Sequence, residues 1–366
     1  MFCVLQTPAL LFPLGLTPVQ GVAVAGFSVI LFGAIFFWRY RLAFACFGVA
    51  GLMAVGLLDI PHLIEFAGLD IILFLFAMMI VIGFLEEGFF FEYLVERFLV
   101  VVGPHPKRIM VAMMVMSAVS AALVDEVTSI LFMTAAMLNL IGRAKVNPIP
   151  FIMMLVFATN IGSSATVVGN PVGVIIAMRS GLTFADFLRW ATPISVVALA
   201  VAIPTCLKIF AKDIDALKGV LTGKRGERHI EQVVRDDQQA KKAFLKGSGL
   251  FGGVVAGLLL HHAIEEALHL PANTMLLGVA LLGAGFALAM SGEKSRMLVE
   301  KRVDWWTLSF FLMLFASVGT LKQSGVTGVL AQRMLAFSGD NIPLLLTLFA
   351  WSSGALTSVM DNVLAV

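Results

Sequence analysis

Two adjacent acids, Asp125 and Glu126, lie near the centre of an apolar block that runs from 108 to 142. An ionised carboxylate at the centre of a bilayer costs at least roughly 2.5 kcal/mol, so such residues are retained where they pair with a cation or exchange a proton. A hydrogen-bonded structural role inside the protein is the alternative. The pair therefore predicts a cation or proton site at membrane depth.

A second polar cluster interrupts the next apolar block, 150–180. The residues that should unwind its middle are Asn160, Gly162, Ser163, Ser164, Thr166, Gly169, Asn170 and Pro171. Non-helical backbone at membrane depth is tolerated only against protein or a wet cavity. Unwound carbonyls and hard side-chain oxygens suit Na⁺, and the candidate ligands are Asp125, Thr128, Asn160, Ser163, Ser164 and Thr166. Close helix packing by the small residues is the alternative interpretation.

The elements that must position these residues are membrane helices. Hydrophobic residues make up 60% of the 366 residues and charged residues only 13%, which predicts an all-α polytopic membrane protein. Further apolar stretches of about twenty residues occur near 19–37, 42–58, 70–86, 186–209, 248–266, 272–290 and 305–321. We expect a multi-pass protein of a prokaryotic cytoplasmic membrane.

Several other classes of protein are disfavoured. The sequence shows no nucleotide-binding βαβ unit and no nucleic-acid-binding stripe, and Cys3, Cys46 and Cys206 have no pairing or metal spacing. "HHAIEEALH" (261–269) resembles metal-ligand spacing but is interpreted as a polar helix cap, and "GSGLFG" (247–252) lacks the strand that a dinucleotide site needs. We therefore expect no enzyme, no cofactor beyond a coupling ion, and no nucleic-acid partner.

The flanks of the block 108–142 indicate how it enters the membrane. "HPKR" precedes it and "GRAK" follows it, and basic flanks favour the cytoplasmic side. Two flanks on one side predict a re-entrant hairpin with "VDEVTS" at its tip. With the end of the first span placed inside, the 25 Lys and Arg residues fall on the cytoplasmic side except for Arg179, Arg189, Lys322 and Arg333.

An internal repeat of opposite sense is also predicted. The segments 69–88 and 303–325 each have an entry Asp, an apolar span and a Gly-containing exit, and 121–132 aligns with 355–366, which places Asp125 opposite Asp361. We therefore expect an N-terminal repeat at 1–210, a cytoplasmic connector at 211–247 and an inverted C-terminal repeat at 248–366. Inverted repeats with hairpins and broken helices are typical of secondary transporters, whose site lies at the midplane.

The two polar motifs resemble a known family. "VDEVTSILFMT" is similar to the D-N-V-T hairpin signature, and "TNIGSSATVVGNPVGVII" to the N-I-G-G-x-A-T-x-x-G-D-P-P-N-x-I signature, of the ion transporter superfamily of arsenite permeases, citrate and dicarboxylate transporters, the P protein and D-type Na⁺/H⁺ antiporters. The resemblance implies an elevator-type homodimer. It also implies that the hairpin tip contributes Asp125, Glu126 and Thr128, that the broken helix contributes Asn160, Gly162, Ser164, Thr166, Gly169, Asn170 and Pro171, and that Asp361 and Asn362 form a second tip.

The sequence departs from the family pattern at the site. Glu126 stands where the family has Asn, Asn170 stands where it has Asp, and Val172 with Gly173 replaces P-N. Family members also continue for some fifty to seventy residues past the position of Val366, so the resemblance implies a C-terminally truncated second half. Three functions follow as hypotheses: symport of a small anion of the citrate or arsenite type with Na⁺ or H⁺, Na⁺/H⁺ antiport, or an inactive or scaffold membrane fragment.

Overall fold

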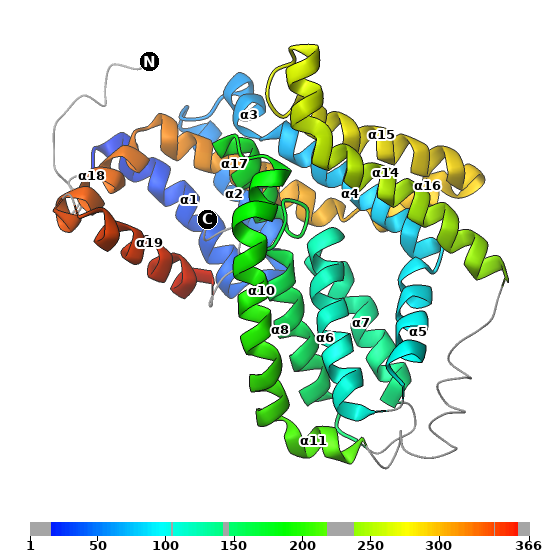
Figure 1. The fold of residues 1–366 in the computed structure, drawn as a ribbon. Helices are drawn as coiled ribbons and strands as arrows, with labels where there is room; N and C mark the ends of the chain where they lie inside the picture. The colour runs from blue at the N-terminus through cyan, green and yellow to red at the C-terminus, as the bar shows by residue number, and fades with distance from the viewer. Residues whose placement is uncertain (1–15, 104, 142–145, 218–237, 340, 358–366) are drawn as a thin grey trace. The chain divides into compact units, whose positions relative to one another are not determined.

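The computed structural model describes residues 16–103, 105–141, 146–217, 238–339 and 341–357 (Figure 1). Over these residues the chain is helical and contains no β-strand, which confirms the all-α expectation. Within them, seven helical stretches are long and apolar enough to cross a membrane: Pro18–Phe36, Leu69–Glu87, Pro106–Leu123, Phe184–Ile209, Lys241–Leu268, Thr274–Arg302 and Trp305–Gln323. These are the helices of a multi-pass membrane protein.

One of the expected crossings is shorter than the sequence predicted. The stretch 42–58 forms α2 (Arg41–Ala54), which has 14 residues, and the chain then turns with Gly56 at a φ of 75°. The Asp59 carboxylate accepts a hydrogen bond of 2.9 Å from the backbone N–H of His62 and so begins α3 (Ile60–Phe66). A helix of this length rises about 21 Å, which is less than the hydrocarbon core of roughly 30 Å. The prediction of an ordinary span at 42–58 was therefore wrong.

The first of two compact units joins Met1–Leu73 to Asp304–Val366. In it, α17 packs against α1, α2 and α3, and the guanidinium of Arg41 donates to the Thr307 hydroxyl over 2.8 Å. A Cβ added at Gly319 would lie 2.3 Å from the Phe66 ring, so glycine is needed for the close approach of α17 and α3. Besides α2 and α3, its elements are α1 (Pro18–Phe36), η1 (Trp38–Tyr40), α17 (Trp305–Gln323), α18 (Val326–Ser338) and α19 (Ile342–Thr357).

The second unit runs from Phe74 to Val303. It holds most of α4 (Leu69–Glu87) and the following helices: α5 (Phe90–Val102), α6 (Pro106–Leu123), α7 (Glu126–Ile141), α8 (Ile149–Ser163), α9 (Pro171–Ser180), α10 (Phe184–Ile209), α11 (Ala211–Ala216), α14 (Gln238–Leu268), α15 (Thr274–Ser291), η2 (Gly292–Lys294), α16 (Ser295–Met297) and η3 (Leu298–Arg302). Figure 1 shows α6, α7, α8 and α10 side by side, and α8 contacts each of the other three.

Methionines fill the core of this helix bundle. The buried cluster includes Met110, Met113, Met114, Met116, Met133, Met137 and Met154, together with Phe151 and Leu155. Methionine adapts its shape to irregular gaps, and helices in lipid associate by close packing because burial from lipid supplies little hydrophobic driving force. The methionines therefore serve to hold the polar elements of α6, α7 and α8 in a fixed arrangement.

The compact units group the chain by contact, whereas the expected repeats group it by sequence order. The first unit joins the two ends of the chain, so it does not test the boundaries 1–210, 211–247 and 248–366, and the inverted repeat stays a prediction. Residues 238–247 of the expected connector form the first turns of α14, and 218–237 lie outside the described residues.

Candidate ion and substrate site

The first part of the site is a helical hairpin. α6 ends at Leu123, α7 begins at Glu126, and the two helices contact each other along the hairpin. At the tip, the Asp125 carboxylate accepts a hydrogen bond of 2.8 Å from the backbone N–H of Thr128. A side-chain oxygen that binds the N–H of the third helical residue is an N-cap. Asp125 therefore fixes the start of α7, and this bond orients its carboxylate at the tip.

The second part is the interrupted helix, which confirms the predicted break within 150–180. α8 ends at Ser163, residues 164–170 are not helical, and α9 begins at Pro171. The Asn170 side chain accepts a hydrogen bond of 2.8 Å from the Gly173 N–H, and proline at the first helical position costs no hydrogen bond. The restart of the helix is thus encoded locally by Asn170 and Pro171.

Two glycines let the broken helix lie directly against the hairpin. A Cβ on Gly162 would lie 2.1 Å from the carbonyl oxygen of Ala118 in α6. A Cβ on Gly169 would lie 2.1 Å from the Ser163 carbonyl oxygen and 2.9 Å from that of Ala121. Backbone atoms cannot move aside as a flexible side chain can, so any larger residue would separate the two elements.

Two hydrogen bonds join the hairpin to the broken helix, and a third lies within the broken helix. The Ser163 hydroxyl donates to the Glu126 carboxylate over 3.1 Å, and the Thr166 hydroxyl donates to the Ala122 carbonyl. The Asn170 amide donates to the Ser163 carbonyl over 3.3 Å. Glu126 therefore contacts the broken helix directly, and the sequence alone had not shown whether it faced the site or a neighbouring helix.

Not all the predicted site residues take part in these contacts. The exposed Asn160 amide donates to the Val156 carbonyl of its own helix over 3.0 Å. The exposed Ser164 hydroxyl lies 2.8 Å from the Ile161 carbonyl and 3.1 Å from the Ser195 hydroxyl of α10. Within the described residues, neither side chain forms a hydrogen bond with the hairpin tip. Asp361 and Asn362 lie outside the described residues.

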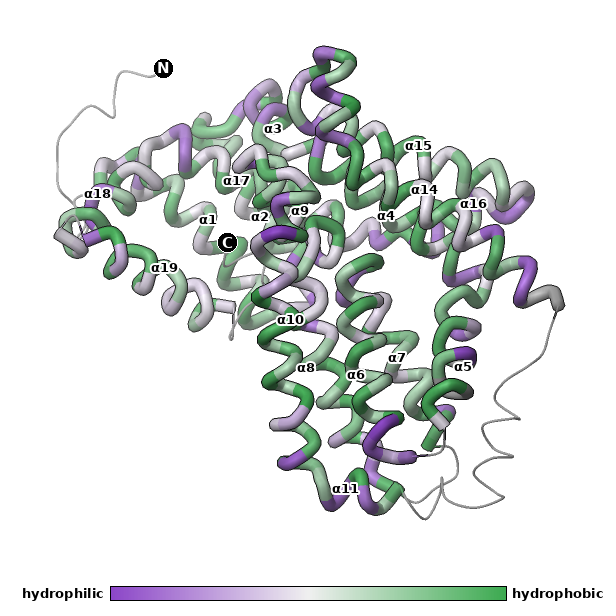
Figure 2. The backbone as a smooth tube through the Cα atoms, in the orientation of Figure 1, coloured by the Kyte–Doolittle hydropathy of each residue, from purple (hydrophilic) through white to green (hydrophobic). Residues whose placement is uncertain are grey.

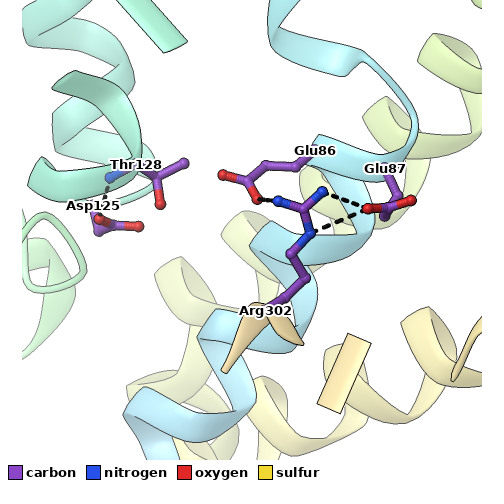
Figure 3. Close-up of polar contacts among 5 residues, drawn as sticks. All are labelled: Glu86, Glu87, Asp125, Thr128 and Arg302. Carbon is purple, nitrogen blue, oxygen red and sulfur yellow. Dashed lines mark hydrogen bonds and ion pairs between the residues drawn. The ribbon is translucent and has the colours of Figure 1, made fainter. Parts of the chain in front are cut away.

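The structure adds a polar residue that sequence reasoning missed. Glu86, at the end of α4, points toward the turn that carries Asp125 and Thr128, and on its other side it binds Arg302 (Figure 3). The Arg302 guanidinium lies 3.0 Å from the Glu86 carboxylate and also binds Glu87. The acidic pair at the end of a span was visible in the sequence, but nothing there indicated its partner more than 200 residues away.

Buried hydroxyls form a further group near the hairpin. Ser117 in α6 and Ser129 in α7 are fully buried, and within the described residues neither hydroxyl has a hydrogen-bond partner. An unsatisfied buried hydroxyl costs about 1–3 kcal/mol. Ser129 follows Thr128 directly, so its hydroxyl oxygen lies in the first turn of α7, next to the tip.

The acidic and histidine residues of 261–269 have a structural role. The buried Glu265 carboxylate accepts a hydrogen bond of 2.8 Å from the Met275 N–H at the start of α15, and His261 bonds the Leu258 carbonyl at 2.7 Å. Within the described residues no group of three or more His, Cys, Asp and Glu side chains is placed to hold a metal. Glu265 thus caps the start of α15, and the interpretation of the segment as a polar helix cap stays a prediction.

The structure has apolar helices of crossing length, a helical hairpin and an interrupted helix, and a hydrogen bond links the last two. Such a combination is typical of multi-pass membrane transporters. Residues 29–366 match the citrate transporter family, and the chain belongs to that family.

The chain is also similar to several individual proteins. The chain is 34% identical over 297 residues to an uncharacterized transporter of Mycobacterium bovis, covering 80% of this chain and 65% of that relative. A similar protein of Mycobacterium tuberculosis is 33% identical over 349 residues, covering 93% and 76%. The P protein of Mus musculus is 20% identical over 372 residues, covering 83% and 44%. The chain thus spans just under two thirds of the first relative's length. The matched family and the first of these relatives are named as transporters.

Proposed function

We propose that the protein is a secondary active transporter that moves a small anion, of the citrate or dicarboxylate type or arsenite, with Na⁺ or H⁺ as the coupling ion. Membership of the citrate transporter family supports a carboxylate substrate. The proposal rests on one observation. Two helices end and two begin where the hairpin is hydrogen-bonded to the broken helix: α6 and α8 end there, and α7 and α9 begin there.

These helix ends supply groups for both a cation and an anion. α6 ends at Leu123 and α8 at Ser163, and helix C-terminal ends present free carbonyl oxygens. α7 begins at Glu126 and α9 at Pro171, and helix N-terminal ends present N–H groups and a positive dipole. Cation and anion sites built from discontinuous helices are the pattern of coupled transporters.

The side chains at the tip favour the cation side of the site. Asp125 and Glu126 supply two half-buried carboxylates, and Ser163, Thr166 and Thr128 supply hydroxyl oxygens nearby. In our proposal Asp361 and Asn362 complete the site as a second tip, within an inverted repeat and an elevator-type homodimer. The anion would bind at the N-terminal ends of α7 and α9.

Na⁺/H⁺ antiport is the second candidate, and a specific observation favours it. Glu86 faces Asp125 and Thr128 (Figure 3), so three carboxylates, those of Glu86, Asp125 and Glu126, gather near one tip. Carboxylates within membrane segments commonly mark proton relays and ion pathways. Such a cluster can exchange protons for Na⁺ without any anion.

Proteoliposomes separate these functions. The purified protein is reconstituted, a Na⁺ gradient is applied, and internal pH and anion uptake are measured with and without citrate or arsenite. Uptake of an anion that depends on the Na⁺ or H⁺ gradient supports the symporter. Proton movement driven by Na⁺ alone supports the antiporter, and the absence of both fluxes would overturn both and leave the scaffold hypothesis.

A further inference from the structure

A pocket of about 490 Å³ lies where α4 ends beside the first turns of α14 and the end of α15. Three exposed lysines line it: Lys242 and Lys246 of α14 and Lys294 of η2. Lys242 and Lys246 are four residues apart and so lie on one face of their helix. Within the described residues none of these three ammonium groups is paired with a carboxylate.

The charge of the pocket is positive. Glu87 is the one acidic residue among the described residues that line it, and its carboxylate already binds the Arg302 guanidinium. Three lysines therefore line the pocket, and its one described carboxylate is neutralised by another partner. Such a pocket attracts an anion of more than one negative oxygen.

The rest of the wall is apolar. It includes Phe84, Leu85, Phe90, Met290 and Leu298. Gly247 keeps this wall open on the α14 side, because a Cβ there would lie 3.1 Å from the Leu85 side chain and 3.2 Å from the Phe90 ring. A ligand that fits both parts of the pocket is amphiphilic, with an anionic head and a hydrocarbon portion.

The position of the lysines along α14 fits the membrane surface. α14 has 31 residues and is therefore about 46 Å long, whereas a hydrocarbon core is roughly 30 Å thick. Its excess length must lie outside the core, and Figure 2 shows hydrophilic stretches at the beginning of α14 and after α15. The lysines thus lie where lipid head groups begin.

We propose that this pocket binds the phosphate head group of an anionic phospholipid, with Lys242, Lys246 and Lys294 around the phosphate and the apolar wall against the start of the acyl chains. Basic pockets between membrane helices recognise lipid head groups in this way. A free phosphate would use the lysines but not the apolar wall, which is why the lipid is favoured.

The experiment measures bound lipid by native mass spectrometry of the detergent-purified protein titrated with phosphatidylglycerol, phosphatidylcholine or inorganic phosphate. Wild type should bind phosphatidylglycerol and not the other two. The variant Lys242→Gln/Lys246→Gln/Lys294→Gln should raise the apparent Kd for phosphatidylglycerol at least tenfold, since each lysine near an anionic lipid contributes roughly a factor of five.

The chain offers a matched control. Lys241, Lys212 and Lys301 are exposed and do not line the pocket, so their triple change to Gln removes the same charge and should leave binding within about twofold of wild type. Equal loss in both triple variants, or no loss in the pocket variant, would overturn the site. Inorganic phosphate that displaces phosphatidylglycerol at equal concentration would overturn the lipid assignment.

Folding of the variants is checked separately. The change of all three pocket lysines to Arg keeps the charge and should keep binding, and helix content in phosphatidylcholine micelles should match wild type for every variant. If the triple Gln variant does not fold, two single variants test the lipid site instead: Lys294→Gln in the pocket and Lys301→Gln outside it. A roughly fivefold loss confined to Lys294→Gln is expected, and equal binding in the two would contradict the proposal.

Discussion

The Ser163 hydroxyl donates a hydrogen bond of 3.1 Å to the Glu126 carboxylate, joining the end of α8 to the beginning of α7. These residues lie 37 positions apart in the sequence. Glu126 follows the turn between α6 and α7, and Ser163 precedes the break between α8 and α9. The hydrogen bond therefore makes a single site from two separately encoded breaks. The predictions below test what holds this site together and what its carboxylates do.

Asp125 caps α7 and, in our proposal, binds the coupling cation. Substitutions can separate these two roles. Asn caps a helix about as well as Asp, so Asp125→Asn should leave the free energy of unfolding within about 0.5 kcal/mol of wild type while abolishing cation-coupled transport. Asp125→Ala should also lose about 1 kcal/mol of stability because the cap is lost. Chemical unfolding in micelles and flux in proteoliposomes measure the two effects. Normal coupled flux in Asp125→Asn would remove this residue from the site.

Ser163 and Ser164 are adjacent but have different contacts. Ser163→Ala removes the donor to Glu126, and a hydrogen bond to a charged group contributes about 1.5–3 kcal/mol, so coupled transport should fall roughly tenfold or more. Ser164→Ala removes only contacts to Ile161 and Ser195 and should keep most of the activity. Initial rates at several Na⁺ concentrations measure both variants. A larger loss in Ser164→Ala would show that the resemblance to the family motif predicts the ligand better than this geometry does.

Gly162 should tolerate no side chain. The Cβ of Gly162→Ala would lie 2.1 Å from the Ala118 carbonyl oxygen, and overpacking of this kind costs about 1–3 kcal/mol. Gly285→Ala in α15 is the control, because no atom lies within 4 Å of the added Cβ, and it should be neutral or stabilising by up to about 1 kcal/mol. Unfolding midpoints of the two variants give the comparison. Similar midpoints would mean that α6 and α8 are not in close contact.

Arg302 should stabilise the acidic pair that ends α4. Its side chain is 38% exposed and those of Glu86 and Glu87 are 25% and 26% exposed, so Arg302→Gln should cost about 1–2 kcal/mol, less than a fully buried pair would. The exposed pair Arg296 and Glu300 is the control, and Arg296→Gln should cost no more than about 0.5 kcal/mol.

A double-mutant cycle then assigns the effect of Arg302 to its partner. Glu86→Gln combined with Arg302→Gln should recover part of the stability, since the uncompensated carboxylate is gone. Additive losses would show that the ion pair with Glu86 contributes nothing.

Asp59 should make the start of α3 sensitive to acid. The hydrogen bond from the His62 N–H, helped by the His62 side chain, lowers the pKa of the Asp59 carboxyl below its usual value. A group whose pKa is lower in the folded state stabilises the fold above its unfolded pKa, and this contribution is lost as pH falls through the folded value. Asp59→Asn should remove that dependence while keeping the cap, as followed by hydrogen exchange of the His62 amide as the pH falls below about 4. Unchanged acid dependence in Asp59→Asn would contradict the assignment.

Local chemistry explains why much of the fold could be predicted. Long apolar stretches specify membrane helices wherever they occur, and Asn170 with Pro171 begins α9 through a bond to the neighbouring Gly173. The turn at Asp125 is encoded in the same way, by a carboxylate that caps the next helix. The exception is α2, whose apolar run continues to Leu58 although the helix ends at Ala54, because hydropathy does not sense a turn at Gly56.

The sequence by itself therefore determined that the protein is a bundle of membrane helices with two polar interruptions, because helix formation and helix breaking depend on residues a few positions apart. Only the tertiary structure decided which polar atoms meet: Glu126 binds Ser163, Glu86 turns toward Asp125, and Asn160 bonds its own helix instead. A helix turns about 100° per residue, so adjacent side chains face different neighbours. Which neighbour each one meets depends on the glycine contacts and methionine packing that set how the helices lie together.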